Sequence, residues 1–306
     1  MKNNLQTIFF SSFLQILGIF VVTFFILHLI PGDPIQVMLG ESAAISDQIK
    51  LRTELGLNKP IYVQLMDSFL QIISGDFGKS ILTGIPIKGQ IVIAMKNTYI
   101  LALSALFIAM VFGITGGIIA AKYMGTLIDR NIINISLFFI SIPHFFLGPL
   151  LMLCLSIWFG WLPISGMHSL SSIVLPALTL SLGMLAIIIK MTRNCMIEII
   201  DSEAVRTARA KGMTEWKITI HHIFRLVLIP LITIIGMQFG SLLSGAVITE
   251  TLFSWNGLGM LLVDSIQTRD YPITQACIFI IAISYVFVNL LTEILYKVVD
   301  PRMKSL

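Results

Sequence analysis

Five long stretches of this chain carry no Lys, Arg, Asp or Glu, and they constrain the fold more than any motif does. They cover residues 3–32, 97–121, 131–189, 226–249 and 271–292. A helix needs about 20 apolar residues to cross the hydrocarbon core of a membrane. Only 12% of the 306 residues are charged and 56% are hydrophobic, whereas a soluble domain is about 25% charged. A water-soluble fold of this size could not cover so much apolar surface.

Each uncharged stretch predicts one membrane span, except the longest, which predicts two. Gly160, Pro163 and Gly166 mark a loop inside it, because glycine and proline interrupt helices. We therefore expect an all-α polytopic membrane protein with six transmembrane helices, in a single transmembrane domain over residues 1–306. The expected spans lie near residues 8–30, 98–121, 132–159, 173–192, 229–249 and 275–296.

The distribution of Lys and Arg predicts the orientation of these spans. Basic residues gather in the segments that are cytoplasmic if the amino terminus lies inside, whereas the short external segments 160–172 and 250–274 hold only Arg269. Both termini are therefore expected in the cytoplasm. The external segment 31–97 carries six basic residues but is too long to obey this rule strongly. The net charge of +4 follows from the same bias and does not indicate nucleic-acid binding.

The external segment 31–97 is expected to form a small surface subdomain. Pro31-Gly-Asp-Pro34 ends the first span, because proline cannot continue a helix. Short helices are expected over residues 46–55 and 63–73. Gly75-Asp-Phe-Gly-Lys-Ser80 ends like a phosphate-binding loop, but that loop requires a glycine where residue 73 is Ile. We therefore expect no ATP site in this chain, and no other cofactor bound by it.

A charged segment in the cytoplasmic loop 193–228 predicts a surface helix. The loop holds six Lys/Arg and four Asp/Glu residues. Ser202 or Asp201 can cap a helix that begins near Glu203, and Gly212 suits the left-handed turn that ends one. Small side chains on this helix predict a slim face for another protein, although an ordinary amphipathic connector is an alternative. The candidate docking residues are Glu203, Ala204, Arg206, Thr207, Ala208, Arg209, Ala210, Lys211 and Gly212.

Together, this loop and a series of short motifs resemble the permease subunits of binding-protein-dependent ABC importers. The resemblance is to the oligopeptide, dipeptide, nickel and glutathione branch, and it runs over nearly the whole chain. The motifs are Pro31-Gly-Asp-Pro34, Leu55-Gly-Leu-Asn-Lys-Pro60, Gly75-Asp-Phe-Gly78, Ser141-Ile-Pro143, Gly160-Trp-Leu-Pro163, Leu175-Pro176, Thr249-Glu-Thr-Leu-Phe-Ser-Trp255, Gly257-Leu-Gly259, Arg269-Asp-Tyr-Pro272 and Asp300-Pro-Arg302.

The resemblance implies a type I ABC importer permease fold and a division of labour between subunits. A second, similar permease would complete the path, two cytoplasmic ATPases would bind the 193–228 coupling loop, and an external binding protein would deliver substrate. The chain would then be a multi-pass protein of a bacterial plasma (inner) membrane that contacts lipid and uses ATP only through its partners. Short peptides are the expected substrate, with nickel, a nickel chelate or glutathione as alternatives.

The chain departs from the family pattern at two places. Arg206-Thr207-Ala208 stands where the general family has Glu-Ala-Ala, as it does in the peptide and nickel branch. Asn256 stands where that branch usually has proline before Gly-Leu-Gly. The first departure does not indicate loss of docking, and the effect of the second is left open.

Glu250 and Trp255 are candidates for a gate or a pathway contact at the external end of the fifth span. An interfacial carboxylate beside an aromatic anchor is the competing interpretation. An ion-coupled secondary transporter is the competing class, but we take the middles of all six expected spans to lack Asp, Glu, Lys, Arg and His, the residues that carry ions in such proteins. The three cysteines, Cys154, Cys195 and Cys277, lack metal-like spacing. We therefore expect no catalytic residue and no metal site.

Overall fold

The computed structural model of the chain describes residues 2–29, 35, 39–40, 44–54 and 56–299. Within these ranges the chain is helical, and its only strand-like feature is a single bridge between Lys79 and Pro86. The helices are α1 (Lys2–Leu29), α3 (Ile45–Glu54), α4 (Ile61–Ile73), α5 (Ile87–Lys122), α6 (Leu127–Ser141), α7 (His144–Leu151), α8 (Val174–Ile200), α9 (Glu203–Ala210), α10 (Glu215–Ile218), α11 (Arg225–Leu252), α12 (Leu258–Gln267) and α13 (Tyr271–Val299). Shorter π or 3₁₀ turns cover Met152–Trp158, Leu170–Ile173 and Thr219–Phe224.

The helices belong to two compact units, which we describe separately. The first contains residues 1–98 and 256–286, and the second contains residues 99–255 and 287–306. Helices α5 and α13 each contribute to both units.

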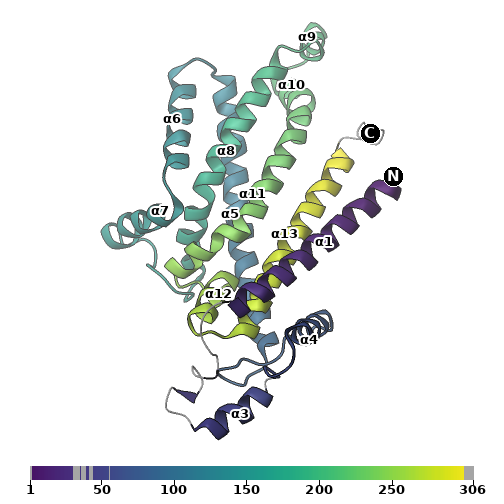
Figure 1. The fold of residues 1–306 in the computed structure, drawn as a ribbon. Coiled ribbons are helices and arrows are strands. Elements are labelled where there is room, and N and C mark those ends of the chain that lie inside the picture. The colour runs from purple at the N-terminus through teal and green to yellow at the C-terminus, as the bar shows by residue number, and fades with distance from the viewer. Residues whose placement is uncertain (1, 30–34, 36–38, 41–43, 55, 300–306) are drawn as a thin grey trace. The chain divides into compact units, whose positions relative to one another are not determined.

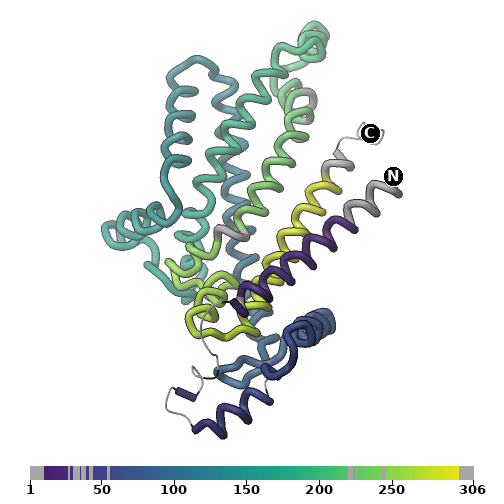
Figure 2. The backbone as a smooth tube through the Cα atoms, viewed as in Figure 1, coloured from purple at the N-terminus to yellow at the C-terminus, as the bar shows by residue number. Residues whose placement is uncertain are grey.

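In the first unit, α1 and α13 lie side by side (Figures 1 and 2), with α4 against them. Phe20 of α1 contacts Phe279 of α13 edge to face at a ring-centroid distance of 5.9 Å, and it contacts Phe69 of α4 at 5.4 Å. The buried Asp270 accepts a hydrogen bond from the Ser80 hydroxyl. These contacts hold the expected external segment against the end of α13.

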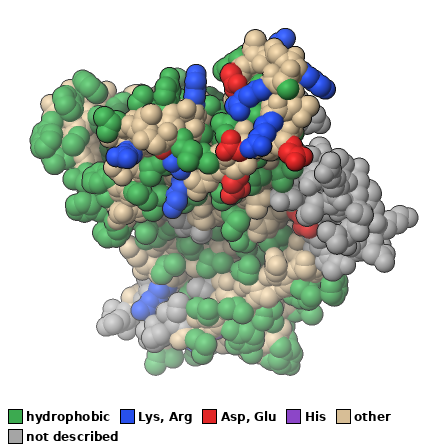
Figure 3. All heavy atoms as spheres, turned by 90° about the horizontal axis from the view of Figure 1, so that it is seen from above, with side chains coloured by type: hydrophobic (Ala, Val, Ile, Leu, Met, Phe, Trp, Pro, Cys, Tyr) green, Lys and Arg blue, Asp and Glu red, His purple; other side chains and the backbone are tan. Residues whose placement is uncertain are grey.

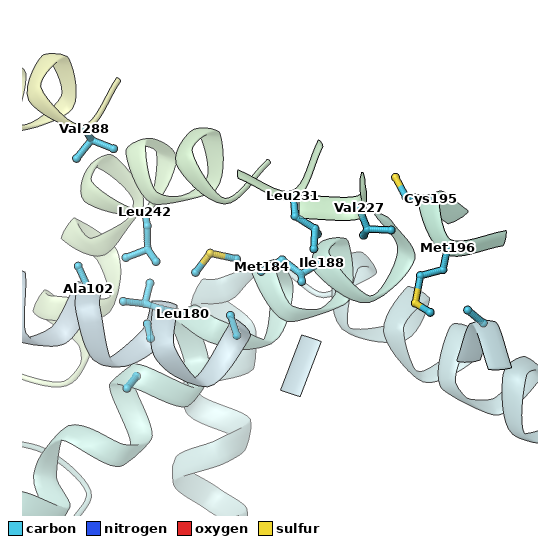
Figure 4. Packing of buried hydrophobic residues seen from close by; sticks show 14 of the residues in the cluster. Ala102, Leu180, Met184, Ile188, Cys195, Met196, Val227, Leu231, Leu242 and Val288 are labelled. Atoms are coloured by element: carbon cyan, nitrogen blue, oxygen red, sulfur yellow. The ribbon is translucent and has the colours of Figure 1, made fainter. Parts of the chain in front are cut away.

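In the second unit, α5, α8 and α11 share one hydrophobic core that also includes residues of α9. Leu180, Met184 and Ile188 of α8 lie among Leu231 and Leu242 of α11 (Figure 4). Because lipid is as apolar as these side chains, helices in a membrane associate mainly through close van der Waals packing. Close approach of the backbones therefore matters more here than in a soluble core.

Glycines on α5 permit that close approach to α8. A Cβ atom added at Gly113 would lie 2.8 Å from Ile188 Cγ2, and one added at Gly117 would lie 2.5 Å from Thr192 Cβ. Gly236 of α11 approaches Thr292 of α13 in the same way, with a Cβ at 2.2 Å from Thr292 Oγ1. The helices therefore pack closely at all three of these glycines.

We expect Gly117→Ala to lower the free energy of unfolding by about 1–3 kcal/mol, the usual cost of overpacking. The matched control is Gly18→Ala in α1, where an added Cβ meets no atom within 4 Å. The control should be neutral or slightly stabilising, by up to about 1 kcal/mol. Thermal unfolding of both variants in detergent measures the difference. Equal midpoints would contradict the packing role of Gly117.

Three of the helical segments are long and apolar enough to cross a membrane, and counting each bent pair of helices as one span raises this to as many as five among the described residues. The three are Ile87–Lys122, Leu170–Ile200 and Tyr271–Leu295. Phe10–Ile26 of α1 is a shorter apolar helix within the residues searched. The structure thus supports a multi-span helical protein, while six spans and cytoplasmic termini remain predictions.

The prediction that the third span, 132–159, is one continuous helix was wrong. Its two parts, Leu127–Ser141 and His144–Trp158, are inclined by 108°. Pro143 explains the break, because proline disfavours helical geometry in the residue before it. Ile142 is accordingly extended, with φ −95° and ψ 121°.

Other helix boundaries differ less from those predicted. Helix α8 continues to Ile200, well past the predicted end at residue 192, because no glycine or proline interrupts residues 193–200. The predicted loop at 160–166 is confirmed, with φ values of +64° at Gly160 and +87° at Gly166. The Pro31–Pro34 and Asp300–Arg302 motifs lie outside the described residues.

Candidate functional site

The predicted surface helix of the cytoplasmic loop is α9, and its first turn forms without the expected side-chain cap. Ser202 occupies the cap position with an extended backbone, and its carbonyl accepts a hydrogen bond from the Arg206 N–H at 3.1 Å. The Ser202 hydroxyl, however, has no hydrogen-bond partner among the described residues. The predicted boundary is therefore confirmed, whereas the predicted side-chain cap is wrong.

The carboxyl end of α9 closes through backbone geometry that requires glycine. Gly212 has a φ of +73°, in the left-handed region that residues with a Cβ rarely adopt. The Gly212 N–H donates to the Arg209 carbonyl at 2.9 Å, and the Met213 N–H donates to the Ala208 carbonyl at 3.3 Å. This pair of bonds is the Schellman motif. The prediction that Gly212 ends the helix is confirmed.

Helix α9 presents one face to its own protein and the opposite face to the outside. Val205 is 0% exposed and Ala208 is 4% exposed, and both belong to the core of the second unit. The prediction that Ala208 forms part of an open slim face was wrong, because its spacing of three from Val205 turns it inward. The other predicted docking residues are all exposed; they are Glu203, Ala204, Arg206, Thr207, Arg209, Ala210, Lys211 and Gly212.

An ion pair joins α9 to α10 on this surface. Arg209 Nε donates to Glu215 Oε1 at 2.8 Å, and both side chains are largely exposed. Trp216 of α10 is 73% exposed beside them. In the space-filling view, acidic and basic side chains gather over α9 and α10 (Figure 3). The surface therefore combines mixed charge with an exposed aromatic ring, a combination that suits a protein partner.

The pKa of Glu215 determines the pH range over which this ion pair persists. The hydrogen bond from Arg209 lowers the pKa of the Glu215 carboxyl below its ordinary value of 4.5. A carboxyl group with a depressed pKa in the folded state contributes stability at neutral pH and loses it as the pH falls through that pKa. We expect hydrogen exchange in residues 203–218 to be faster in Glu215→Gln than in the wild type at pH 7. The difference should shrink as the pH falls through the lowered pKa of Glu215 and vanish once the carboxyl is fully protonated. A difference that persisted in the fully protonated protein would contradict this assignment.

A second ion pair, which the sequence analysis did not find, joins α6 to α8. Arg193 donates to Asp129 through Nε at 2.6 Å and through Nη2 at 2.7 Å, and the Gly125 N–H donates to Asp129 Oδ2 at 2.9 Å. Asp129 is buried, at 3% exposure. Asp129 lies just before the uncharged stretch 131–189 and Arg193 lies just after it. This position at the two ends of one stretch was the only feature of the sequence that pointed to the pair. The pair ties the start of α6 to the helix that leads into α9.

Glu250 and Trp255 lie together, but inside the protein. Glu250 is 0% exposed and Trp255 is 4% exposed. The Trp255 N–H donates to the Glu250 carbonyl oxygen at 2.8 Å, after α11 ends at Leu252. The interpretation of Trp255 as an interfacial aromatic anchor was wrong, because the core of the second unit covers its ring. A gate or pathway role for the two residues remains a prediction.

The prediction that no histidine lies in the middle of an expected span was wrong. His144 lies near the middle of the predicted third span and begins α7 directly after the break at Pro143. His144 lines a mainly hydrophobic cavity of the second unit, so the middle of that span is not purely apolar.

Comparison with known proteins identifies the family. Residues 113–305 match the family described as the binding-protein-dependent transport system inner membrane component, and residues 1–90 match the amino-terminal region of such membrane components. The chain belongs to this permease family. The recognition made from the sequence motifs is confirmed, and the permease is therefore a transport component of the membrane.

The similar curated relatives come from the peptide and glutathione branch. The permease is 34% identical to the dipeptide transport system permease protein DppB of Escherichia coli K12, over 94% of each chain. It is 36% identical to the glutathione transport system permease protein GsiC of the same strain, over 93% of each chain. The permease also resembles one chain of an inward-facing structure of the MetNI methionine ABC transporter, with a TM-score of 0.59 and 18% identity. The match covers 70% of the permease and 98% of the MetNI chain. The last comparison confirms the fold alone.

Proposed function

We propose that the permease is one of two membrane subunits of an ATP-driven importer and that its substrates are short peptides. The observation that carries the proposal is the α9–α10 surface, an amphipathic helix packed on its own core by Val205 and Ala208 with its charged face outward. Family membership supports the import role. The relatives named for dipeptide and glutathione transport support a peptide substrate, since glutathione is itself a small peptide.

In the proposed mechanism, two cytoplasmic ATPases bind the α9–α10 surfaces of this chain and of a second, similar permease. Closure of the ATPases on ATP would move α9, and α8 would follow because only two residues separate the helices. The Asp129–Arg193 ion pair would carry this motion from α8 to α6. The close contacts of Gly113 and Gly117 with α8 would carry it to α5. Such rigid-body movement alternates access between the two sides of a membrane. An external binding protein would deliver the peptide.

Uptake assays in a strain that lacks the permease gene test the proposal. Labelled dipeptide, glutathione and nickel are compared in the deletion strain and in the complemented strain. We expect complementation to restore dipeptide or glutathione uptake and to leave nickel uptake unchanged. Restoration of nickel uptake alone would replace the peptide assignment by the metal alternative.

The same assay separates an ATP-driven importer from an ion-coupled transporter. The proposal predicts that uptake stops when cellular ATP is depleted and continues when an uncoupler collapses the proton gradient while ATP is maintained. Loss of uptake with the proton gradient alone would favour the ion-coupled class, for which the position of His144 inside an expected span is the relevant observation.

A further inference from the structure

A partly open cavity lies beside the break in the third expected span, in the second unit. The cavity has a volume of about 320 Å³ and is lined by the end of α6, the first residue of α7, the middle of α8 and the middle of α11. Its wall is mainly hydrophobic, and Leu180, Met184 and Leu242 of that wall are visible in Figure 4. Three polar residues, His144, Gln238 and Ser241, also line the cavity; His144 and Ser241 are exposed and Gln238 is half-buried.

The cavity lies deep within the expected membrane region. Gln238 lies near the midpoint of α11, which spans Arg225–Leu252, so at 1.5 Å per residue it is about 20 Å from either end of the helix. A polar side chain at that depth is costly unless it faces a cavity or a polar partner. Gln238 therefore favours a functional cavity over a packing defect.

The imidazole of His144 has a defined orientation in this cavity. Its Nδ1 lies 3.2 Å from the carbonyl oxygen of Thr179 on α8. A carbonyl oxygen can only accept, so Nδ1 carries the hydrogen and donates it. In the neutral ring, Nε2 is then left as an acceptor. The histidine thus offers a fixed hydrogen-bond acceptor at the break between α6 and α7.

Gly183 makes room for this ring. A Cβ atom at Gly183 would lie 2.9 Å from His144 Cε1 and 3.4 Å from His144 Nε2. Any side chain at this position would push the imidazole away from α8. The absence of a side chain at Gly183 is therefore part of the geometry that places His144.

Gln238 adds hydrogen-bonding groups of both kinds to the cavity. The Ser241 hydroxyl donates to the Gln238 backbone carbonyl oxygen at 2.9 Å, so this serine is engaged within α11. The Gln238 side-chain amide can both donate and accept. The cavity therefore presents an acceptor at His144 and a paired donor and acceptor at Gln238. A peptide unit, with one N–H and one C=O, has the matching pattern.

We propose that this cavity is an intramembrane site that holds the backbone of a short peptide during its passage, with His144 and Gln238 as contact residues. The inference rests on the proposed function, since it takes the substrate to be a peptide. The volume lies at the small end of the range for small-molecule sites, about 300–1,000 Å³. It suits a segment of dipeptide size better than a long oligopeptide.

Kinetics of peptide uptake test the contact residues. Gln238→Leu and His144→Phe remove the polar groups at similar size, and each should lower dipeptide uptake about tenfold or more. Gln238→Asn and His144→Gln keep a polar group and should retain more activity than these variants. The matched control is Met237→Leu, on the adjacent exposed face of α11, where Met237 is 66% exposed. Complex assembly and dipeptide affinity of the binding protein should stay unchanged in every variant.

Chemical labelling gives a second readout. A Ser241→Cys variant should react with a small thiol reagent in the assembled transporter, and added dipeptide should slow the reaction. The parent chain, with its three native cysteines, sets the background. Cross-linking of this cysteine to the second permease, with no protection by dipeptide, would overturn the proposal and assign the cavity to a subunit interface.

The uptake results also separate this inference from the proposed function. If the wild type imports dipeptide but Gln238→Leu and His144→Phe import it equally well, the cavity proposal is overturned and the proposed function stands. If the wild type imports no peptide, both are overturned.

Discussion

Replacement of Asp129 by Ala is expected to lower the free energy of unfolding of the permease by about 3 kcal/mol. Removing one partner of a buried ion pair leaves the other charge unpaired, which typically costs about 3–5 kcal/mol. We place the effect at the low end of this range, because the Arg193 side chain is 21% exposed and water can partly solvate its unpaired charge. The measurement is thermal unfolding of the purified chain in detergent, in which the midpoint should fall by several degrees.

Two controls show whether the unpaired charge causes this effect. Lys59 and Asp67 also form an ion pair, at 2.6 Å, but their side chains are 53% and 44% exposed. Lys59→Ala should therefore cost less than about 1 kcal/mol. Replacing both partners, as Asp129→Leu with Arg193→Met, should be much less harmful than Asp129→Ala alone. An Asp129→Ala midpoint no lower than that of Lys59→Ala would contradict the role assigned to the pair.

The second large effect is expected on the outer face of α9. Ala210 is exposed and lies on the side of the helix opposite Val205 and Ala208. If the ATPases bind this face, Ala210→Trp should reduce peptide uptake about tenfold or more, since a loss of 1.4 kcal/mol in docking already lowers binding tenfold. The fold should be unaffected, because the new ring has no core residue to displace. The measurement is dipeptide uptake at matched levels of the permease in the membrane.

The control for this substitution is Ala44→Trp, an equal change at an exposed alanine of the expected external segment. It should leave uptake close to that of the wild type. Ala208→Glu is unsuitable as a docking variant, because Ala208 is 4% exposed and a charge there would unfold α9 from its core. Equal uptake by Ala210→Trp and Ala44→Trp would place the ATPase contact elsewhere.

The sequence predicted the parts of the structure that depend on local chemistry. The apolar stretches indicated helices, and Gly212 indicated the end of α9, because a left-handed turn favours glycine. The side of α9 that faces inward was misassigned at Ala208, although its spacing of three from Val205 places the two on one face of the helix. Small side chains alone did not distinguish a face that meets the core from one that meets a partner. The bend at Pro143 was present as a motif, but a 108° break cannot be distinguished from a mild kink by sequence alone.

Contacts between distant residues were beyond reach of the sequence. Asp129 and Arg193 are 64 residues apart, and nothing local marks them as partners. The same holds for the cavity, in which residues 144, 183 and 238 come together from three helices. Both features depend on how the helices of the second unit pack, and no single periodic pattern encodes that arrangement.

Purification of the tagged permease from its native membrane, with its partners identified by mass spectrometry, tests the central claim most directly. We predict that a second permease and ATP-binding subunits accompany the wild type and Ala44→Trp, and that Ala210→Trp loses the ATP-binding subunits while keeping the second permease. A chain that purifies alone, or an Ala210→Trp variant that retains its ATP-binding subunits in full, would contradict the assignment of α9 as the surface on which the ATPases act.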